Sequence, residues 1–90
     1  MNKSDLVSAI ADNSGLSKAD AARALDATTS AISGALASGD SVNITGFGSF
    51  LVRARAARTG RNPQTGAAIQ ISASNAPAFK VGKLLKESVN

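Results

Sequence analysis

Residues 58–66 read RTGRNPQTG, and this stretch decides how the rest of the chain is interpreted. A glycine three residues after an Asn-Pro pair is typical of a tight turn, because proline suits the first central position and glycine accepts a positive φ. Residues 49–58 alternate between two faces before the turn, and Ile69 and Ile71 alternate with polar residues after it. This pattern predicts a long β-hairpin with Pro63 at its tip.

The predicted hairpin arm, residues 54–73, is poor in large apolar side chains. It carries only Ile69 and Ile71, so it has no extended hydrophobic face of its own. A strand pair of this kind is marginal by itself, and we expect it to be mobile until a ligand binds it. At ~3.3 Å per residue, roughly nine residues per side reach about 30 Å, which is long enough to embrace a nucleic-acid duplex.

Ahead of the arm, residues 1–39 are expected to form two helices. Asn2 is a candidate N-cap for the first helix, which breaks at the Asn-Ser-Gly of residues 13–15. Ser17 is a candidate N-cap for the second helix, with Asp20 in the place of the glutamate of a capping box. The apolar positions expected to pack from these helices are Leu6, Leu25, Ile32 and Leu36.

Strand-like alternation begins after the two helices. We expect strands over residues 40–53 and 74–81, with Ile44 on an apolar face and Pro77 interrupting the second stretch. Residues 82–90 can form a short closing helix, which is too short to be stable without packing. The order of helix, helix, strands, long hairpin and helix predicts a single α+β domain over the whole chain.

Alanine makes up much of the apolar content. Apolar residues are 43% of the 90-residue chain, and 18 of these 39 residues are alanine, which leaves 21 large apolar side chains. A chain this short buries a modest fraction of its surface, and it has no Cys or His for disulfides or the common zinc sites. We therefore expect an obligate dimer or higher oligomer. Because the usual nucleophile–base pairs are missing too, we expect no enzyme, metal or cofactor site.

The charges are divided unevenly along the chain, whose net charge is +4. Residues 1–45 carry three cations and five anions, whereas residues 46–90 carry seven cations and one anion, Glu87. A half-chain of one sign predicts a polyanionic partner, either nucleic acid or an acidic membrane surface. No apolar run approaches membrane-spanning length and the N-terminus does not resemble a signal peptide, so we expect a soluble cytoplasmic protein. The cations of the basic half are Arg53, Arg55, Arg58, Arg61, Lys80, Lys83 and Lys86.

Each of these groups has a purely structural interpretation beside the functional one. Arg53 and Arg55 share one face of a strand, which suits phosphate recognition, yet an arginine series also fits a solvated strand edge. The closing lysines are either the solvated face of an amphipathic helix or part of a continuous basic surface. Pro63 either only shapes the turn or inserts between base steps as an apolar wedge. Two roles are considered for Phe47, Phe50 and Phe79. They could stack on bases, or they could pack in the core or the subunit interface. Their apolar and glycine neighbours favour packing.

Two motifs resemble one protein family. GFGSF at residues 46–50 and GRNPQTG at residues 60–66 look like the HU family of bacterial histone-like DNA-binding proteins, of which integration host factor is the sister branch. The resemblance runs over the whole chain. It implies an intertwined dimer with a helical base, a three-stranded antiparallel saddle and two arms around the DNA minor groove. It also implies that the arm arginines, Asn62 and Pro63 reach into the groove and that Pro63 intercalates at a kink. Lys3, Lys80, Lys83 and Lys86 would hold the flanking phosphates.

Two pairs of residues depart from the pattern of this family. Ala67 and Ala68 follow the tip where relatives commonly place a lysine and a polar or proline residue, so one arm cation per subunit is missing. Thr28 and Thr29 replace residues that are more apolar in relatives, and we therefore expect a less tightly packed dimer core.

The expected function is architectural. A homodimer, or a heterodimer with a paralogue, would bind double-stranded DNA in the nucleoid with little sequence preference, bend and compact it, and favour nicks, junctions and other easily kinked sites. The alternative is a sequence-specific bender like integration host factor, for which Asn43 and Thr45 are the candidate readers on the saddle. A module for RNA or anionic membrane is the third hypothesis. The tip has no large apolar anchor for a membrane, whereas RNA stays as a secondary ligand.

Overall fold

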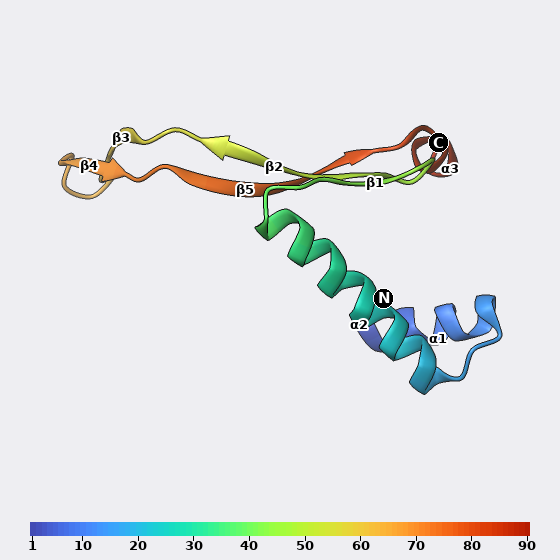
Figure 1. Ribbon diagram of the computed structural model, residues 1–90. Helices are drawn as coiled ribbons and strands as arrows, with labels where there is room; N and C mark the ends of the chain where they lie inside the picture. The colour runs from blue at the N-terminus through green and yellow to red at the C-terminus, as the bar shows by residue number, and fades with distance from the viewer. The chain divides into compact units, whose positions relative to one another are not determined.

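Two helices, α1 (Lys3–Ser14) and α2 (Lys18–Ala37), begin the chain in the computed structural model, which describes residues 1–90 (Figure 1). The expected capping of α1 is confirmed: Asp5 N–H donates to Asn2 Oδ1 at 2.9 Å, and Asn2 N–H donates to Asp5 Oδ2 at 3.1 Å. Gly15 ends α1 in the left-handed conformation, with φ 76°. α1 therefore begins and ends where local sequence signals place it.

The start of α2 differs in detail from the expected capping box. Asp20 N–H donates to Ser17 Oγ at 3.1 Å, as predicted. The carboxylate of Asp20 accepts a hydrogen bond from the guanidinium of Arg23, one turn further along the helix. A charged partner in the same helix thus occupies the carboxylate that the capping box would have directed back to the N-cap.

The chain forms two compact units, Met1–Ala35 and Leu36–Asn90. The buried apolar residues of the whole chain are two alanines, Ala11 in α1 and Ala21 in α2, and no large side chain is fully buried. Within the first unit an ion pair joins the helices, with 2.8 Å between Lys3 Nζ and Asp26 Oδ1. A single copy of the chain therefore lacks a core of large side chains.

The second unit is built on a three-stranded antiparallel sheet, as expected. Its strands are β1 (Val42–Ile44), β2 (Gly48–Arg55) and β5 (Ser74–Val81), in the order β1-β2-β5. The closing helix α3 (Lys83–Ser88) follows β5 and lies at one end of this unit, whereas the tip of the hairpin lies at the other end (Figure 1). The central strand β2 pairs along its whole length with β5.

The register separates the sheet into an apolar and a polar face, because residues directly opposite each other share a face. Phe50 lies opposite both Val42 and Phe79, and the ring centroids of Phe50 and Phe79 are 4.9 Å apart. The ring of Phe47 lies 5.5 Å from that of Phe79. Gly48 leaves room for this cluster, since a Cβ there would be 2.4 Å from the Phe79 ring. Three aromatic rings therefore pack together on one face of the sheet.

The prediction that Pro77 interrupts the returning strand is wrong. Pro77 lies within β5, opposite Val52 of β2. β5 is an edge strand of the sheet, and an edge strand accommodates proline because half of its backbone groups make no ladder hydrogen bonds.

The prediction of one continuous strand up to Arg58 is also wrong. β2 ends at Arg55, and a separate two-stranded sheet follows, formed by β3 (Arg58–Arg61) and β4 (Ala68–Ile71). Residues 56–57 and 72–73 lie in neither sheet. These residues are Ala56, Ala57, Ser72 and Ala73, whose small side chains make no cross-strand pairs of the kind that stabilise a ladder.

Candidate nucleic-acid interface

The polar face of the three-stranded sheet carries a row of polar and basic residues. Asn43, Ser49 and Lys80 lie opposite one another across β1, β2 and β5, and Ser49 Oγ donates to Asn43 Oδ1 at 3.0 Å. Arg53 and Arg55 lie four and six residues after Ser49 on the same strand, so they project from this face as the sequence predicts. All three cations are exposed. The sheet thus presents a basic face opposite the face that holds the aromatic rings.

The two-stranded sheet of β3 and β4 has two arginines, and they lie on opposite faces. Arg58 lies opposite Ile71 and Arg61 lies opposite Ala68. Because these arginines are three residues apart on one strand, their side chains leave from different faces of the hairpin. Both are exposed. An arm with a guanidinium on each face can contact both walls of a groove at once.

A shallow hollow of about 350 Å³ lies at the break between the sheet and the arm. Arg55 and Arg58 line it, and the hydroxyl-bearing residues Ser72 and Ser74 line it from the returning chain. No acidic residue lies between Asp40 and Glu87 in the sequence, so no carboxylate of this part of the chain competes for the guanidinium groups. Two guanidinium groups and two hydroxyls supply the donors that a phosphate group requires.

The tip is a closed turn that presents Pro63 to the solvent. Asn62 N–H donates to Ala67 O at 2.8 Å, and Gly66 N–H donates to Asn62 O at 2.7 Å. Gly66 has φ 71°, a conformation that favours glycine. Pro63 is exposed, whereas Asn62 is half-buried. The backbone of the tip is therefore held by its own hydrogen bonds, and the proline ring stays free.

The lysines are exposed, and two of them make ion pairs. Lys83 Nζ lies 4.0 Å from Glu87 Oε1 within α3. Lys86 lies three residues after Lys83 on the same helix, as predicted. Lys3 belongs to the first unit and pairs with Asp26. Exposed ion pairs of this kind contribute only about 0–1 kcal/mol, so a phosphate group can replace the carboxylate at small cost.

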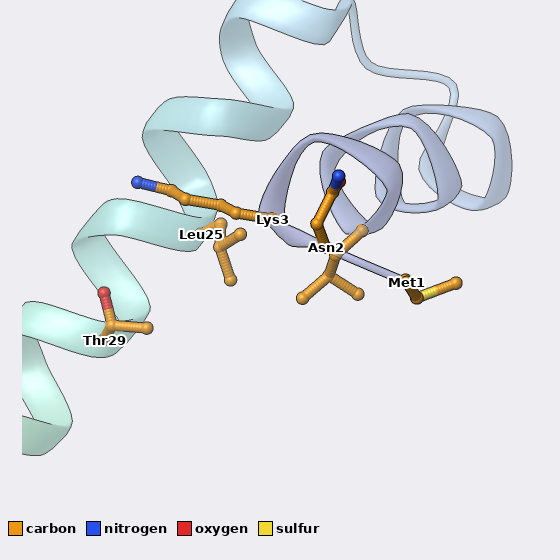
Figure 2. A pocket seen from close by; sticks show the side chains of 6 residues that line it. Met1, Asn2, Lys3, Leu25 and Thr29 are labelled. Atoms are coloured by element: carbon orange, nitrogen blue, oxygen red, sulfur yellow. The ribbon is translucent and has the colours of Figure 1, made fainter.

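An apolar depression of about 490 Å³ lies in the first unit, beside α1 and α2 (Figure 2). Its lining holds one ionisable side chain, Lys3, together with residues such as Leu6, Leu25 and Thr29. No group of three or more His, Cys, Asp or Glu residues is placed to hold a metal ion. No helix is both long and apolar enough to cross a lipid bilayer.

The sequence did not indicate the two serines of the hollow as site residues. Ser74 lies opposite Arg55, and this pairing depends on the register between β2 and β5. The alternation of serine and alanine over residues 72–74 is visible in the sequence, and it is the one signal that could have indicated hydroxyls on a shared strand face.

A basic sheet face that continues into a basic arm is typical of a nucleic-acid-binding protein. The family model described as bacterial DNA-binding protein matches residues 1–90, and the chain belongs to this family. It is 58% identical over 90 residues to DNA-binding protein HU-beta of Pseudomonas aeruginosa, and the match covers 100% of both chains. It is 57% identical over 89 residues to DNA-binding protein HU of Geobacillus stearothermophilus, and the match covers 99% of both chains. These relatives are named as DNA-binding proteins and not as enzymes.

Solved structures of HU proteins are similar to the chain as well. An Anabaena HU–DNA cocrystal structure is similar with a TM-score of 0.92 and 46% identity, over 99% of this chain and 97% of that one. HU from Thermotoga maritima is similar with a TM-score of 0.70 and 34% identity, over 100% of both chains. The expected resemblance to HU is therefore confirmed, and DNA is the ligand of this family.

Proposed function

We propose that this protein is an architectural DNA-binding protein that works as a dimer, bends and compacts double-stranded DNA in the nucleoid, and has little sequence preference. The observation that carries the proposal is the acid-free surface that runs from the polar sheet face along the arm to an exposed proline. The residues of this surface are Arg53, Arg55, Arg58, Arg61, Asn62, Pro63 and Lys80. Lys83 and Lys86 of α3, beside Glu87, are the further proposed DNA contacts of the second unit. Lys3 adds a further cation from the first unit.

Affinity comes from the neutralisation of phosphates. Each arginine or lysine that contacts a phosphate releases condensed counterions, so binding weakens steeply as salt rises. The arm arginines, Asn62 and Pro63 would reach into the minor groove, whose pattern of donors and acceptors is degenerate. This degeneracy favours binding that depends little on sequence.

Bending comes from the exposed proline at the tip of each arm. Pro63 has no N–H to desolvate and a rigid apolar ring, which suits insertion between two base pairs. Unstacking a base step costs a few kcal/mol, and this cost is smaller where the DNA is nicked or otherwise distorted. The protein should therefore favour DNA that bends easily over regular duplex.

A dimer supplies the packing that one chain lacks. Phe47 is 45% exposed and Phe79 is 41% exposed, although both rings belong to the aromatic cluster. Leu6 and Ile44 are also exposed, and Leu25, Ile32 and Leu36 of α2 are only half-buried. We propose that a second copy, or a paralogue, covers these side chains, because large apolar groups at this density require a partner. The proposed dimer core comprises Leu6, Leu25, Ile32, Leu36, Ile44, Phe47, Phe50 and Phe79.

Titration against linear, nicked and four-way-junction DNA at two salt concentrations tests this function. We expect tighter binding to the nicked and junction DNA at both salt concentrations, and a steep loss of affinity at the higher one. Equal affinity for the three forms would contradict the bending proposal.

A second series tests sequence preference and the ligand class. We expect nearly equal affinities for duplexes of different sequence and equal flexibility, because the minor groove offers only a degenerate pattern of donors and acceptors. A strong preference for one sequence would favour the alternative of a specific bender. Competition by duplex RNA and by anionic vesicles completes the series, and stronger competition from either than from duplex DNA would contradict the proposal.

A further inference from the structure

Asn62 stands out from the other residues of the arm because it is shielded from solvent. Of residues 54–73, only Gly60 and Asn62 are half-buried, and the rest are exposed. The shielding of Gly60 has a simple cause, since Ile71 lies so close that a Cβ on Gly60 would be 2.9 Å from Ile71 Cδ1. Asn62 lies at the tip beside the exposed Pro63, and residues 61–68 include no large apolar side chain.

Hydrogen bonds within the tip account for the position of Asn62. Its Oδ1 accepts from Gln64 N–H at 2.9 Å. Its backbone N–H donates to Ala67 O at 2.8 Å, and its backbone C=O accepts from Gly66 N–H at 2.7 Å. Three of the polar groups of Asn62 therefore have partners inside the turn. The bond to Gln64 is the Asx type of turn, in which a short side chain substitutes for a backbone turn.

This side-chain bond encloses Pro63. The atoms from Asn62 Oδ1 to Gln64 N form a closed ring that contains the whole backbone of Pro63. Proline already fixes φ near −65°, and the Asx bond restricts the remaining backbone rotation of Pro63. The direction of the pyrrolidine ring is thus set before any ligand is present, which lowers the entropy cost of ordering the tip on binding.

We propose that Asn62 is a positioning residue for the Pro63 wedge and not a reader of bases. The inference rests on the proposed function, since it requires that Pro63 inserts into DNA. It differs from the expectation that Asn62 itself reaches into the groove. Asn62 Oδ1 accepts from Gln64 N–H and thereby ties the side chain to the turn. A direct contact with the acceptors of the minor groove would instead use the Nδ2 donors of Asn62, and Asn62→Asp removes these donors while it keeps the acceptor.

Asn62→Ala and Asn62→Asp separate positioning from direct contact. The alanine variant loses the acceptor but keeps both backbone bonds, and the aspartate variant keeps an acceptor oxygen in the same place. We expect Asn62→Ala to lower the ratio of bent to unbent complex at saturating protein about fivefold, the equilibrium effect of one net hydrogen bond. The salt dependence of its binding should not change. Asn62→Asp should bind more weakly, because it adds a negative charge, but should restore the bend at saturation.

Gln64→Ala is the matched control at the same tip. It removes an exposed side-chain amide one residue after Pro63 but leaves the backbone N–H that bonds to Asn62. We expect it to bend DNA as the parent protein does. A loss of bending in Gln64→Ala as large as that in Asn62→Ala would overturn the proposal, because it would show that side-chain amides at the tip act on DNA directly.

A double-mutant cycle with Pro63→Ala tests the route of the effect. We expect Asn62→Ala to cause no further loss of bending in the Pro63→Ala background, because the wedge that it positions is gone. Losses that add would overturn the proposal. If Pro63→Ala alone leaves bending unchanged, the wedge and the positioning role both fail. If Pro63→Ala reduces bending but Asn62→Ala does not, only the positioning role fails.

The free protein gives an independent test of the Asx bond. We expect the backbone amide proton of Gln64 to exchange with water more rapidly in Asn62→Ala than in the parent protein, and at the parent rate in Asn62→Asp. An unchanged exchange rate in Asn62→Ala would overturn the proposal without any reference to DNA.

Discussion

The three-stranded sheet and the arm hairpin are both antiparallel, but they use their apolar side chains differently. On the sheet, the rings of Phe50 and Phe79 lie 4.9 Å apart in a cluster of three. On the arm, Ile69 is 46% exposed and no aromatic residue accompanies it. The hairpin is held by four facing residue pairs and by the hydrogen bonds of its own tip. The sheet therefore has the beginning of a core, whereas the arm has none.

This difference indicates two different partners. Phe79 is 41% exposed in a single chain, nearly as much as Ile69, although it lies in the aromatic cluster. Under the proposed function a second copy covers the sheet residue, and DNA covers the arm residue. An apolar side chain exposed in one copy of the chain can thus be covered either by a second copy or by DNA. Substitutions at Phe79 and Ile69 should distinguish the two cases.

Phe79→Ala should have the largest effect on stability. The substitution removes the ring that contacts both other phenylalanines, and a cost of about 3 kcal/mol is expected for a phenylalanine that is buried in the dimer. For a domain of this size the Tm should fall by roughly 15 °C. Thermal unfolding at a fixed protein concentration measures the shift, since the stability of a dimer depends on concentration. A shift of only a degree or two would show that no partner covers the ring.

Arg58→Ala and Arg61→Ala test whether both faces of the arm contact DNA. Each substitution should reduce the slope of log affinity against log salt by about 0.9, the value for one phosphate contact on duplex DNA. Lys18→Ala is a control, because it removes an exposed cation from the first unit and should leave the slope unchanged. A changed slope for only one arginine would mean that the duplex meets a single face of the arm.

Ala67→Lys should increase the affinity for DNA. Ala67 is exposed just after the tip. Its backbone N–H donates to Thr65 Oγ1 at 3.3 Å, and because the donor is a backbone group, a lysine side chain at this position keeps the bond. One added phosphate contact should raise the salt slope by about 0.9. Ala67→Gln controls for side-chain size without charge. Equal affinities for the lysine and glutamine variants would place this position outside the reach of the phosphates.

Ile69→Ala should have the smallest effect on the free protein. An exposed side chain away from any packed cluster usually changes stability by less than about 0.5 kcal/mol. The Tm should therefore stay within about 3 °C of the parent value, in contrast to the shift for Phe79→Ala. A large loss of stability would show that the arm packs against protein in the dimer and is not reserved for DNA.

Local sequence signals predicted the parts of the fold that depend on neighbouring residues. Asn2 and Asp5 lie within one helical turn of each other, and so do Ser17 and Asp20. The starts of both helices could therefore be predicted from the local sequence. The shared face of Arg53 and Arg55 also follows from simple alternation.

The errors concern properties that depend on the arrangement of strands. Pro77 was expected to interrupt a strand, but its tolerance depends on β5 being at the edge of the sheet, which no local pattern reveals. The break at residues 56–57 was missed because alanine fits either face of an alternating pattern. At the tip, the Asn-Pro pair predicted a turn, but the bond from Gln64 N–H to Asn62 Oδ1 depends on the conformation of the closed loop.

Energy transfer between dyes at the two ends of one DNA duplex tests the wedge role of Pro63 most directly. At low salt and saturating protein, Pro63→Ala should still bind, because every phosphate-binding cation is kept. The energy transfer should nevertheless fall toward the value of free DNA, because the group that holds the kink open is lost. Equal transfer for Pro63→Ala and the parent protein, with both bound, would contradict the account.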